Sequence, residues 1–560
     1  MISLNVETRQ PRLYRQRIFN HVKSEKPVLI CGSDNLMFDI IIKNGTIIDG
    51  TGEPMFRGDL GVKDDEIVKI GELHDEKADL IIDAHGKFVC PGFVDVNNHS
   101  DTFWRIFLNP ELESLVYQGI TTIVGGNCGT SLAPLVDART IESIQKWTDL
   151  KNVTVDWLRT KEFFDFLENK KLSINFATLV GHATLRRGIL KDESRSLSPK
   201  EIAFIEKLLK DSLEEGALGL SAGLVYSHAK AASTDELINL SKWVKKYNGV
   251  YATHIRGEQD DIIESLEEAV EIAQKSKVKL HISHLKAMGE KNWSKMDEAL
   301  DIIDHAYENG VDVTFDVYPY TNTGSVLYTI LPDWIAEGGK KMLVRRLKDP
   351  VTRAKVILEM KESDFDYSKI EIAISPLNKT LARKKISEIA ASQEKSVEEA
   401  VVDILVASEG RVIGSMEVLS AKNVEKALLH PLSIVATNGA GYNVDHKETG
   451  EIAHPRSFGA FPKVIHEYVL NKKLLSWEGA IRKMSSLPAK KFGLQKRGAL
   501  LEGNFADVLV LDPEKINGPA SKENPYQYSS GVDFMLVNGK VIVGEGEYNG
   551  EMGGRIIRRN

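Results

Sequence analysis

The sequence is poor in cysteine and has no long apolar run. Its 560 residues include three cysteines, Cys31, Cys90 and Cys128. So few thiols exclude a disulfide scaffold and are typical of a protein from the reducing cytoplasm. No apolar stretch approaches the roughly 20 residues that cross a bilayer, and the Arg-rich first 36 residues lack the apolar core of a secretory signal. We therefore expect a cytoplasmic protein without a membrane partner.

An excess of basic charge is also missing. The chain carries 72 lysines and arginines against 80 acidic residues, for a formal net charge of −8. Proteins that bind nucleic acid usually carry a basic surface, so nucleic acid is not an expected partner. The hydrophobic share of 42% is ordinary for a globular protein. A chain this long favours one large central domain accompanied by smaller structural units.

Regular structure is predicted to begin next to Met37, which we take as the hypothetical biological start. Residues 1–37 are then expected to form a mobile N-terminal extension. From residue 38 to 90, short β-rich runs are separated by Asn-Gly, Thr-Gly and Asp-Asp pairs, and the same style returns in residues 490–560. This pattern predicts a small β-sandwich domain formed by both chain ends.

Between the two ends, strand-like runs alternate with amphipathic stretches. The first run leaves a Pro-Gly turn with apolar residues and ends in the polar side chains of Asn97, His99 and Asp101. Residues two apart on a strand point the same way, so these three are expected to share one face. A buried parallel strand that delivers polar groups at its carboxyl end has this pattern.

Eight such runs occur, and they argue for an α/β fold with a TIM-type (β/α)8 barrel. A Lys/Glu-rich, helical stretch, residues 335–432, interrupts the spacing before the last strand. The predicted barrel therefore comprises residues 91–334 and 433–489, with a helical insertion between them.

Side chains that can bind a metal recur at the predicted strand ends. A single histidine at such an end is most often structural, but a barrel brings the ends of separate strands together. Cys128, His254 and His284 offer a thiolate and two imidazoles, the ligands that Zn²⁺ prefers, and three ligands leave a fourth position for water. His281 breaks the alternation with His284 and is expected to face elsewhere. The full set of candidates is His99, Cys128, His182, His254, His284 and Asp316.

Several longer motifs resemble one known family. In chain order they are FDIIIKNGTIIDGTG, PGFVDVNNHSD, QGITTIVGGNCGTSLAPL, LVGHATLRRGIL, GALGLSAGLVYS, YATHIRGE, ISHLKAMG, FDVYPY, HPRSFGAF, RKMSSLPAKKFGL and RGALLEGNFADVLVLDP. Together they resemble the D-aminoacylase (N-acyl-D-amino-acid deacylase) family of the metal-dependent amidohydrolase superfamily. The Asn-Cys-Gly motif around Cys128 distinguishes this family from amidohydrolases that use a carbamylated lysine.

The resemblance implies a zinc-dependent enzyme that hydrolyses the amide C–N bond of an N-acyl amino acid with metal-activated water. Zinc would bind to Cys128, His254 and His284, with His99 at a second, weaker metal position. Substrate contacts would fall on Lys286, Arg256, Tyr226 and Tyr318, and the cations would suit the free carboxylate of the substrate.

Two departures from the family pattern lie in this site. Asn97 stands where the family has a histidine, and Asn438 stands where it has the aspartate that transfers protons. An amide does not take up a proton at neutral pH, and losing a general base commonly costs ~10²–10⁴-fold in rate. Two functions stay open: a hydrolase with another base, for which Asp101, Asp316 and Asp445 are candidates, or a ligand-binding protein that has lost turnover.

Overall fold

A closed barrel of parallel strands forms the centre of the chain. The computed structural model describes residues 37–141, 155–191, 193–337, 339–363, 365–375 and 379–559. Within them, two parallel sheets, ordered β17-β13-β12-β11-β10-β9 and β6-β7-β8, meet at Leu179 between β8 and β9 and at the bridge from Asn98 to Gly439. The predicted TIM-type barrel is confirmed. Its strands are β6 (Phe93–Asp95), β7 (Ile120–Gly125), β8 (Asn175–Thr178) continued by β9 (Val180–Gly181), β10 (Gly219–Gly223), β11 (Val250–His254), β12 (Lys279–Ile282), β13 (Val313–Val317) and β17 (Ser433–Val435).

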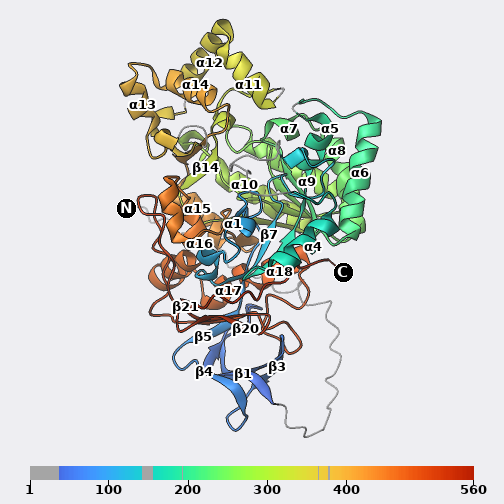
Figure 1. Ribbon diagram of the computed structural model, residues 1–560, viewed down its shortest axis with the longest axis vertical. Helices are drawn as coiled ribbons and strands as arrows, with labels where there is room; N and C mark the ends of the chain where they lie inside the picture. The colour runs from blue at the N-terminus through green and yellow to red at the C-terminus, as the bar shows by residue number, and fades with distance from the viewer. Residues whose placement is uncertain are drawn as a thin grey trace, which may run out of the picture. The chain divides into compact units, whose positions relative to one another are not determined.

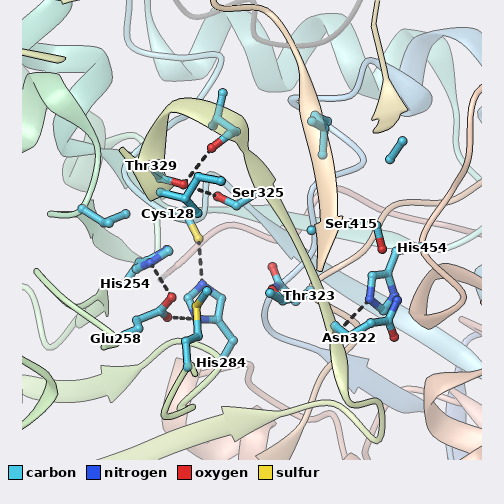
Figure 2. Close-up of a pocket in the computed structure, with 18 of the residues that line it drawn as sticks. Cys128, His254, Glu258, His284, Asn322, Thr323, Ser325, Thr329, Ser415 and His454 are labelled. Carbon is cyan, nitrogen blue, oxygen red and sulfur yellow. Dashed lines mark hydrogen bonds and ion pairs between the residues drawn. The ribbon is translucent and has the colours of Figure 1, made fainter. Parts of the chain in front are cut away.

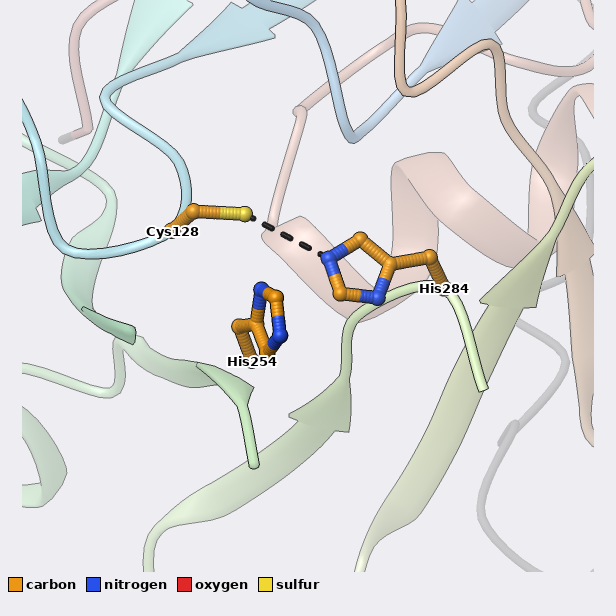
Figure 3. A group of neighbouring side chains, drawn as sticks. All are labelled: Cys128, His254 and His284. Atoms are coloured by element: carbon orange, nitrogen blue, oxygen red, sulfur yellow. Dashed lines mark hydrogen bonds between the residues drawn. The ribbon is translucent and has the colours of Figure 1, made fainter. Parts of the chain in front are cut away.

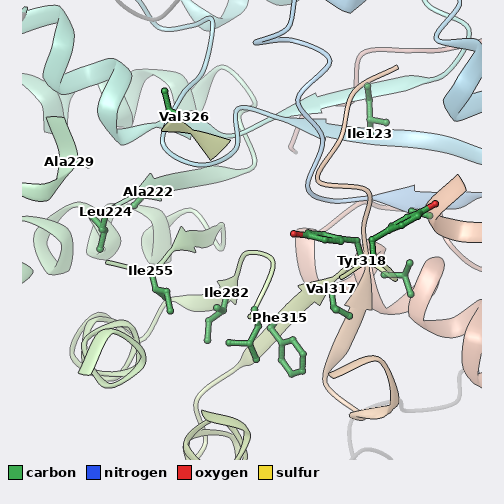
Figure 4. Close-up of a cluster of buried hydrophobic side chains, with 14 of the residues drawn as sticks. Ile123, Ala222, Leu224, Ala229, Ile255, Ile282, Phe315, Val317, Tyr318 and Val326 are labelled. Carbon is green, nitrogen blue, oxygen red and sulfur yellow. The ribbon is translucent and has the colours of Figure 1, made fainter. Parts of the chain in front are cut away.

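Apolar side chains cover both faces of these strands, as parallel strands between helices require. Val94, Val124 and Ile434 belong to the cluster inside the barrel. Ile282 and Phe315 lie on neighbouring strands in the cluster outside it (Figure 4), where the Phe315 ring packs 5.3 Å from that of His430. The helices around the barrel and at its end are α1 (Arg105–Leu108), α2 (Glu113–Val116), α4 (Thr160–Lys170), α5 (His182–Leu190), α6 (Pro199–Glu214), α7 (Ser227–Lys230), α8 (Thr234–Lys246), α9 (Ile262–Ser276), α10 (Lys295–Glu308), α15 (Ala421–Leu429), α16 (Arg456–Val464), η7 (Ile465–Asn471), α17 (Trp477–Met484) and α18 (Ser486–Phe492).

Strands from both chain ends share one nine-stranded sheet, in the order β21-β20-β19-β18-β5-β1-β2-β3, with β4 paired to β1. The junction is the antiparallel pair of β5 and β18, in which Pro91 lies opposite Val508. The predicted β-domain of both chain ends is therefore confirmed, and β5 leads directly into the first barrel strand (Figure 1). The strands are β1 (Phe38–Ile47), β2 (Phe56–Lys63), β3 (Glu66–Gly71), β4 (Ala78–Asp83), β5 (Phe88–Pro91), β18 (Val508–Leu511), β19 (Val532–Val537), β20 (Lys540–Gly544) and β21 (Glu547–Tyr548).

The insertion before the last barrel strand contains a sheet as well as the expected helices. Strand β14 (Asn322–Val326) follows β13 closely and pairs antiparallel with β16 (Ile413–Glu417), which also pairs with β15 (Glu371–Ile374). Strands β15 and β16 were not expected, because a short apolar run has the same periodicity as part of a buried helix. The helices are α11 (Gly339–Lys348), α12 (Pro350–Glu362), α13 (Ile386–Ser392) and α14 (Val397–Ala407), which lie together in Figure 1.

The expected N-terminal extension, with Cys31, lies outside the described residues apart from Met37. The domain boundaries stay predictions, because the chain from Phe38 onward forms one compact unit. In the part of the chain that is described, no helix combines the length and the apolar character needed to span a membrane.

Candidate metal centre and substrate cavity

Three potential metal ligands from three different barrel strands converge. Cys128 lies in the loop after β7, His254 is the last residue of β11, and His284 follows β12. All three side chains are buried, and one ligand atom from each lies within 4.8 Å of the others (Figure 3). Sγ of Cys128 is 3.5 Å from Nε2 of His284, and the two imidazole rings are nearly perpendicular, with centroids 4.3 Å apart.

The backbone at this centre is strained. Cys128, His284 and Asn438 have φ angles of 50°, 40° and 45°, in the left-handed region that side chains with a Cβ seldom adopt. Each such residue costs on the order of 1–3 kcal/mol, and such residues gather where function requires a fixed direction. All three line one cavity, so the backbone there sets the direction of three neighbouring side chains.

Glu258 links the two candidate imidazole ligands. Its Oε1 lies 3.2 Å from Nδ1 of His284, and its Oε2 lies 3.3 Å from Nε2 of His254 (Figure 2). Burial works to raise the pKa of this carboxyl, but the charges of His254 and Lys286 hold that pKa well below its usual range. Glu258 was missed in the sequence, where the only signal was its place four residues after His254 in the YATHIRGE run.

Burial, together with the charges of Lys286 and His254, lowers the pKa of His284 to about 3. The neutral imidazole is the form that binds metals. With Nδ1 of His284 directed to Glu258 and Lys286, Nε2 is the nitrogen that faces Cys128.

The two predicted substrate-binding cations are both in ion pairs. The ammonium group of Lys286 is buried, donates to Glu258 and lies 2.9 Å from Nδ1 of His284. The guanidinium of Arg256 donates from Nε and Nη2 to the Glu268 carboxylate, at 2.8 and 2.7 Å. Both residues line the cavity. Their side chains are nevertheless held by acidic neighbours that the sequence alone did not identify.

Arg456 is a further cation in the lining of the cavity, and the sequence prediction did not include it. It is the first residue of α16 and lies buried, with its guanidinium 4.8 Å from the centroid of the Tyr318 ring. Its Nε and Nη1 have no hydrogen-bond partner among the described residues. Its backbone N–H donates to Nδ1 of His454, whose Nε2 donates to the carbonyl of Asn322. The only sequence signal was its place in the quoted HPRSFGAF motif.

A cavity of about 530 Å³ joins these groups, a volume typical of small-molecule sites. It extends from the three candidate metal ligands to β14, the strand that pairs with β16 of the insertion (Figure 2). Tyr226, predicted as a substrate contact, lines it, and its ring packs 5.4 Å from that of His254. Tyr318, the other predicted contact, is not among the lining residues; its ring supports Arg456.

His99 and Asn438 face each other in this cavity. Nε2 of His99 lies 2.9 Å from Oδ1 of Asn438 and 3.9 Å from Sγ of Cys128. Asn97 points elsewhere and donates through Nδ2 to both oxygens of Asp316, at 3.2 Å each. The expectation that Asn97, His99 and Asp101 share one strand face is wrong, because β6 ends at Asp95 and the following turn separates them.

The three carboxylates considered as replacement bases lie outside the cavity lining. Asp316 accepts from Asn97 and the His284 backbone and pairs with His281, which explains why His281 faces away from the cavity. Asp101 is buried and accepts the Gly126 backbone N–H at 2.7 Å. Asp445 is exposed on the 3₁₀ turn after β17. None of these three carboxylates is placed to contact a ligand in the cavity.

His182, another candidate from its strand end, belongs to a buried ion cluster. Its Nε2 lies 2.8 Å from Glu236, which also accepts two hydrogen bonds from Nη1 of Arg186.

We expect Glu236→Ala to lower the free energy of unfolding by about 3–5 kcal/mol, because it leaves the buried guanidinium of Arg186 without its acidic partner. Metal content should not change. Urea denaturation and metal analysis test this, with the exposed pair partner Glu271 changed to Ala as control. Loss of metal at unchanged stability would contradict a purely structural role for His182.

Comparison with known proteins agrees with this geometry. The amidohydrolase family model matches residues 80–356. D-aminoacylase of Alcaligenes xylosoxydans xylosoxydans is 32% identical over 94% of this chain and 99% of its own length. N-acyl-D-glutamate deacylase of the same organism is 32% identical over 93% of this chain and 97% of its own.

A solved structure of similar architecture is N-acyl-D-glutamate deacylase from Bordetella bronchiseptica, complexed with zinc and a phosphonate inhibitor that mimics the tetrahedral intermediate. It superposes with a TM-score of 0.78 at 30% identity and covers 93% of this chain and 100% of its own. The fold, the motifs and these relatives agree: the chain belongs to the D-aminoacylase (N-acyl-D-amino-acid deacylase) family of amidohydrolases.

Proposed function

We propose that this protein is a zinc-dependent amidohydrolase that cleaves the amide C–N bond of an N-acyl amino acid. The observation that carries the proposal is the convergence of Cys128, His254 and His284 at one end of a large cavity. Relatives that cover nearly the whole chain are N-acyl-D-amino-acid deacylases. A D-amino acid derivative is accordingly the first substrate to test. The cytoplasmic location stays a prediction.

The three candidate ligands fit zinc in chemistry and in spacing. A thiolate and two neutral imidazoles form a common catalytic zinc set. For tetrahedral zinc with bonds of about 2.3 Å to sulfur and about 2.05 Å to nitrogen, the S–N separation is about 3.6 Å. The distance between Sγ of Cys128 and Nε2 of His284 is 3.5 Å. His99 lies close enough to complete a second, weaker position, where Asn97 replaces the family's histidine and is bound to Asp316 instead.

Each neighbouring side chain has a distinct role in this proposal. Zinc, when bound, polarises an amide carbonyl and lowers the pKa of bound water toward ~7. Glu258 orients both imidazoles, and its pairing with Lys286 neutralises its charge. Arg456 offers two buried N–H donors to the substrate carboxylate. Arg456 and Lys286 are both buried, and the low local dielectric constant strengthens their polar contacts.

A specific observation favours a second candidate, a ligand-binding protein without turnover. Asn438 occupies the place where the family has its proton-transferring aspartate, and its amide oxygen contacts His99. An amide cannot take the proton from water at neutral pH. The pocket and its zinc ligands would then serve recognition alone.

One experiment separates the two candidates. Zinc per chain is measured by elemental analysis, and the zinc-loaded protein is incubated with a panel of N-acetyl-D- and N-acetyl-L-amino acids while amine release is followed. Release from at least one member supports the hydrolase. Binding by calorimetry without release from any member, at one zinc per chain, supports the binding protein. A chain that retains no zinc contradicts the proposed metal site.

We expect Arg456→Met to weaken binding of an N-acyl amino acid by about 10- to 100-fold, because a charge-assisted contact contributes about 1.5–3 kcal/mol. Binding of the corresponding neutral amide should change far less. Isothermal titration of both ligands measures the difference. Arg256→Met is the matched control, because Arg256 lines the same cavity but is paired with Glu268. Equal losses for acid and amide in Arg456→Met would contradict the assigned role.

A further inference from the structure

A buried carboxylate inside the barrel adjoins the candidate metal centre, although it does not line the cavity. Asp316 is on β13, and its side chain is fully buried. Its neighbour Phe315 packs outside the barrel, so Asp316 points to the inside, because successive residues of a strand point to opposite faces. The proposed reaction makes no use of Asp316. Its hydrogen bonds indicate a different role.

Donors from three segments of the chain surround the Asp316 carboxylate. Nδ2 of Asn97, in the turn after β6, lies 3.2 Å from both oxygens. Nε2 of His281 lies 2.9 Å from Oδ2, and the backbone N–H of His284 donates to Oδ1 at 3.0 Å. Because a carboxylate only accepts, His281 carries a proton on Nε2, and its Nδ1 accepts from the Thr314 hydroxyl at 2.9 Å. Both carboxylate oxygens are therefore engaged by the protein itself.

Asp316 holds two successive peptide groups at His284. Its Oδ1 accepts the N–H of His284, and its backbone carbonyl accepts the N–H of Leu285 at 2.9 Å. His284 has a φ of 40°, in the region that residues with a Cβ seldom adopt, and such residues persist where their surroundings fix them. In this conformation Nε2 of His284 lies 3.5 Å from Sγ of Cys128 (Figure 3). The two hydrogen bonds therefore fix the direction of a candidate metal ligand.

We propose that Asp316 is a positioning residue of the metal centre, which holds His284 in the conformation that directs Nε2 toward the metal. The inference rests on the proposed function, since it takes zinc as the bound metal. Asp316 acts through His284 and does not itself bind zinc. Groups that hydrogen-bond to a metal ligand commonly contribute about 10- to 100-fold to metal affinity.

The test is the zinc affinity of the full chain, measured by competition with a chelator after removal and return of zinc. We expect Asp316→Asn to weaken zinc binding by about 10- to 100-fold. An amide has a single acceptor oxygen, and its NH2 group would face the donors that now surround the carboxylate. An unchanged zinc Kd in this variant would overturn the inference and leave the proposed function intact. A natural protein that does not bind zinc would contradict both.

Asp507→Asn is the matched control. Asp507 is also a buried carboxylate with several donors. It accepts from Nδ2 of Asn175 at 3.1 Å, from the N–H of Asn538 at 2.8 Å and from the Arg497 guanidinium, and it lies outside the cavity lining. The variant should lower the free energy of unfolding, measured in urea on the zinc-free protein, and keep its zinc Kd. An equal loss of zinc affinity in both variants would mean a general loss of stability and would overturn the assigned role.

Two substitutions at His281 keep the test decisive if Asp316→Asn does not fold. His281→Leu removes the donor to Oδ2 but keeps an apolar contact with the Phe492 ring, which lies 5.2 Å from the imidazole. We expect this variant to weaken zinc binding by about 10-fold. His281→Gln keeps an N–H donor for Oδ2 and should stay within about 3-fold of the natural protein. Equal zinc affinities for the two variants would refute the role of Asp316.

Discussion

Replacing Cys128 with serine is expected to remove zinc from the protein and to lower kcat/KM by at least about 10³-fold. Serine keeps the size of the side chain, but its hydroxyl is not ionised at neutral pH, whereas zinc binds the thiolate. The metal supplies several kcal/mol of transition-state stabilisation, and each 1.36 kcal/mol is a factor of ten. Elemental analysis and the rate of amine release measure the two effects on the same preparation.

Cys90→Ala is the matched control for this experiment. Cys90 is a second buried thiol, placed on β5 outside the cavity, and burial raises the pKa of its thiol. The variant should keep zinc and activity. A Cys128→Ser protein that retains one tightly bound zinc would contradict the proposed ligand set.

Asn438→Asp is expected to raise hydrolysis of an N-acyl amino acid by about 10²–10⁴-fold, the usual contribution of a positioned general base. The carboxylate would stand where the amide now lies 2.9 Å from Nε2 of His99, facing the cavity. The backbone should accept the change, because aspartate tolerates the left-handed conformation nearly as well as asparagine and φ is 45° at this position.

The double variant with Asn97→His tests whether the two departures act together. Adding the histidine should rebuild the weaker metal position, and groups that act as a unit can show little effect singly. Steady-state kinetics at increasing zinc concentration measures the rate of hydrolysis and the occupancy of the second metal position. If the natural protein is already active and Asn438→Asp is neutral or harmful, another group in the cavity transfers the proton, and Glu258 is the one in contact with both imidazoles. If neither protein turns over any substrate although zinc is bound, the binding function replaces the enzymatic one.

The barrel and the convergence of the three candidate metal ligands could be predicted from the sequence, because both depend on local patterns. An apolar run that leads into a histidine or cysteine indicates a barrel strand and the end at which the site lies. His254 ends β11, and His284 follows β12 by two residues. Arg256 and Lys286 show the limit of such patterns. Their positive charge can be read from the sequence. Their ion pairs with Glu268 and Glu258 become apparent only in the folded structure.

Other parts of the site had almost no local signal. Arg456 is one arginine among many until its burial and its unpaired N–H groups are seen. A small apolar cluster in the cavity lining joins Phe103 to residues more than 250 positions later in the chain, such as Ile413. Short strands such as β15 and β16 could not be told from helix by periodicity. Contacts of this range are properties of the tertiary fold, and a single sequence does not display them.

The pairing of β5 with β18 has a consequence for synthesis of the chain on the ribosome. Pro91 and Val508 face each other although they are 417 positions apart, as the two residue numbers show. At about 5–20 residues per second, the β5 edge waits roughly 20–80 s for its partner strand. An unpaired edge of this kind is a template for association with other chains. The nascent amino-terminal half is therefore a natural client for a chaperone until the carboxyl end emerges.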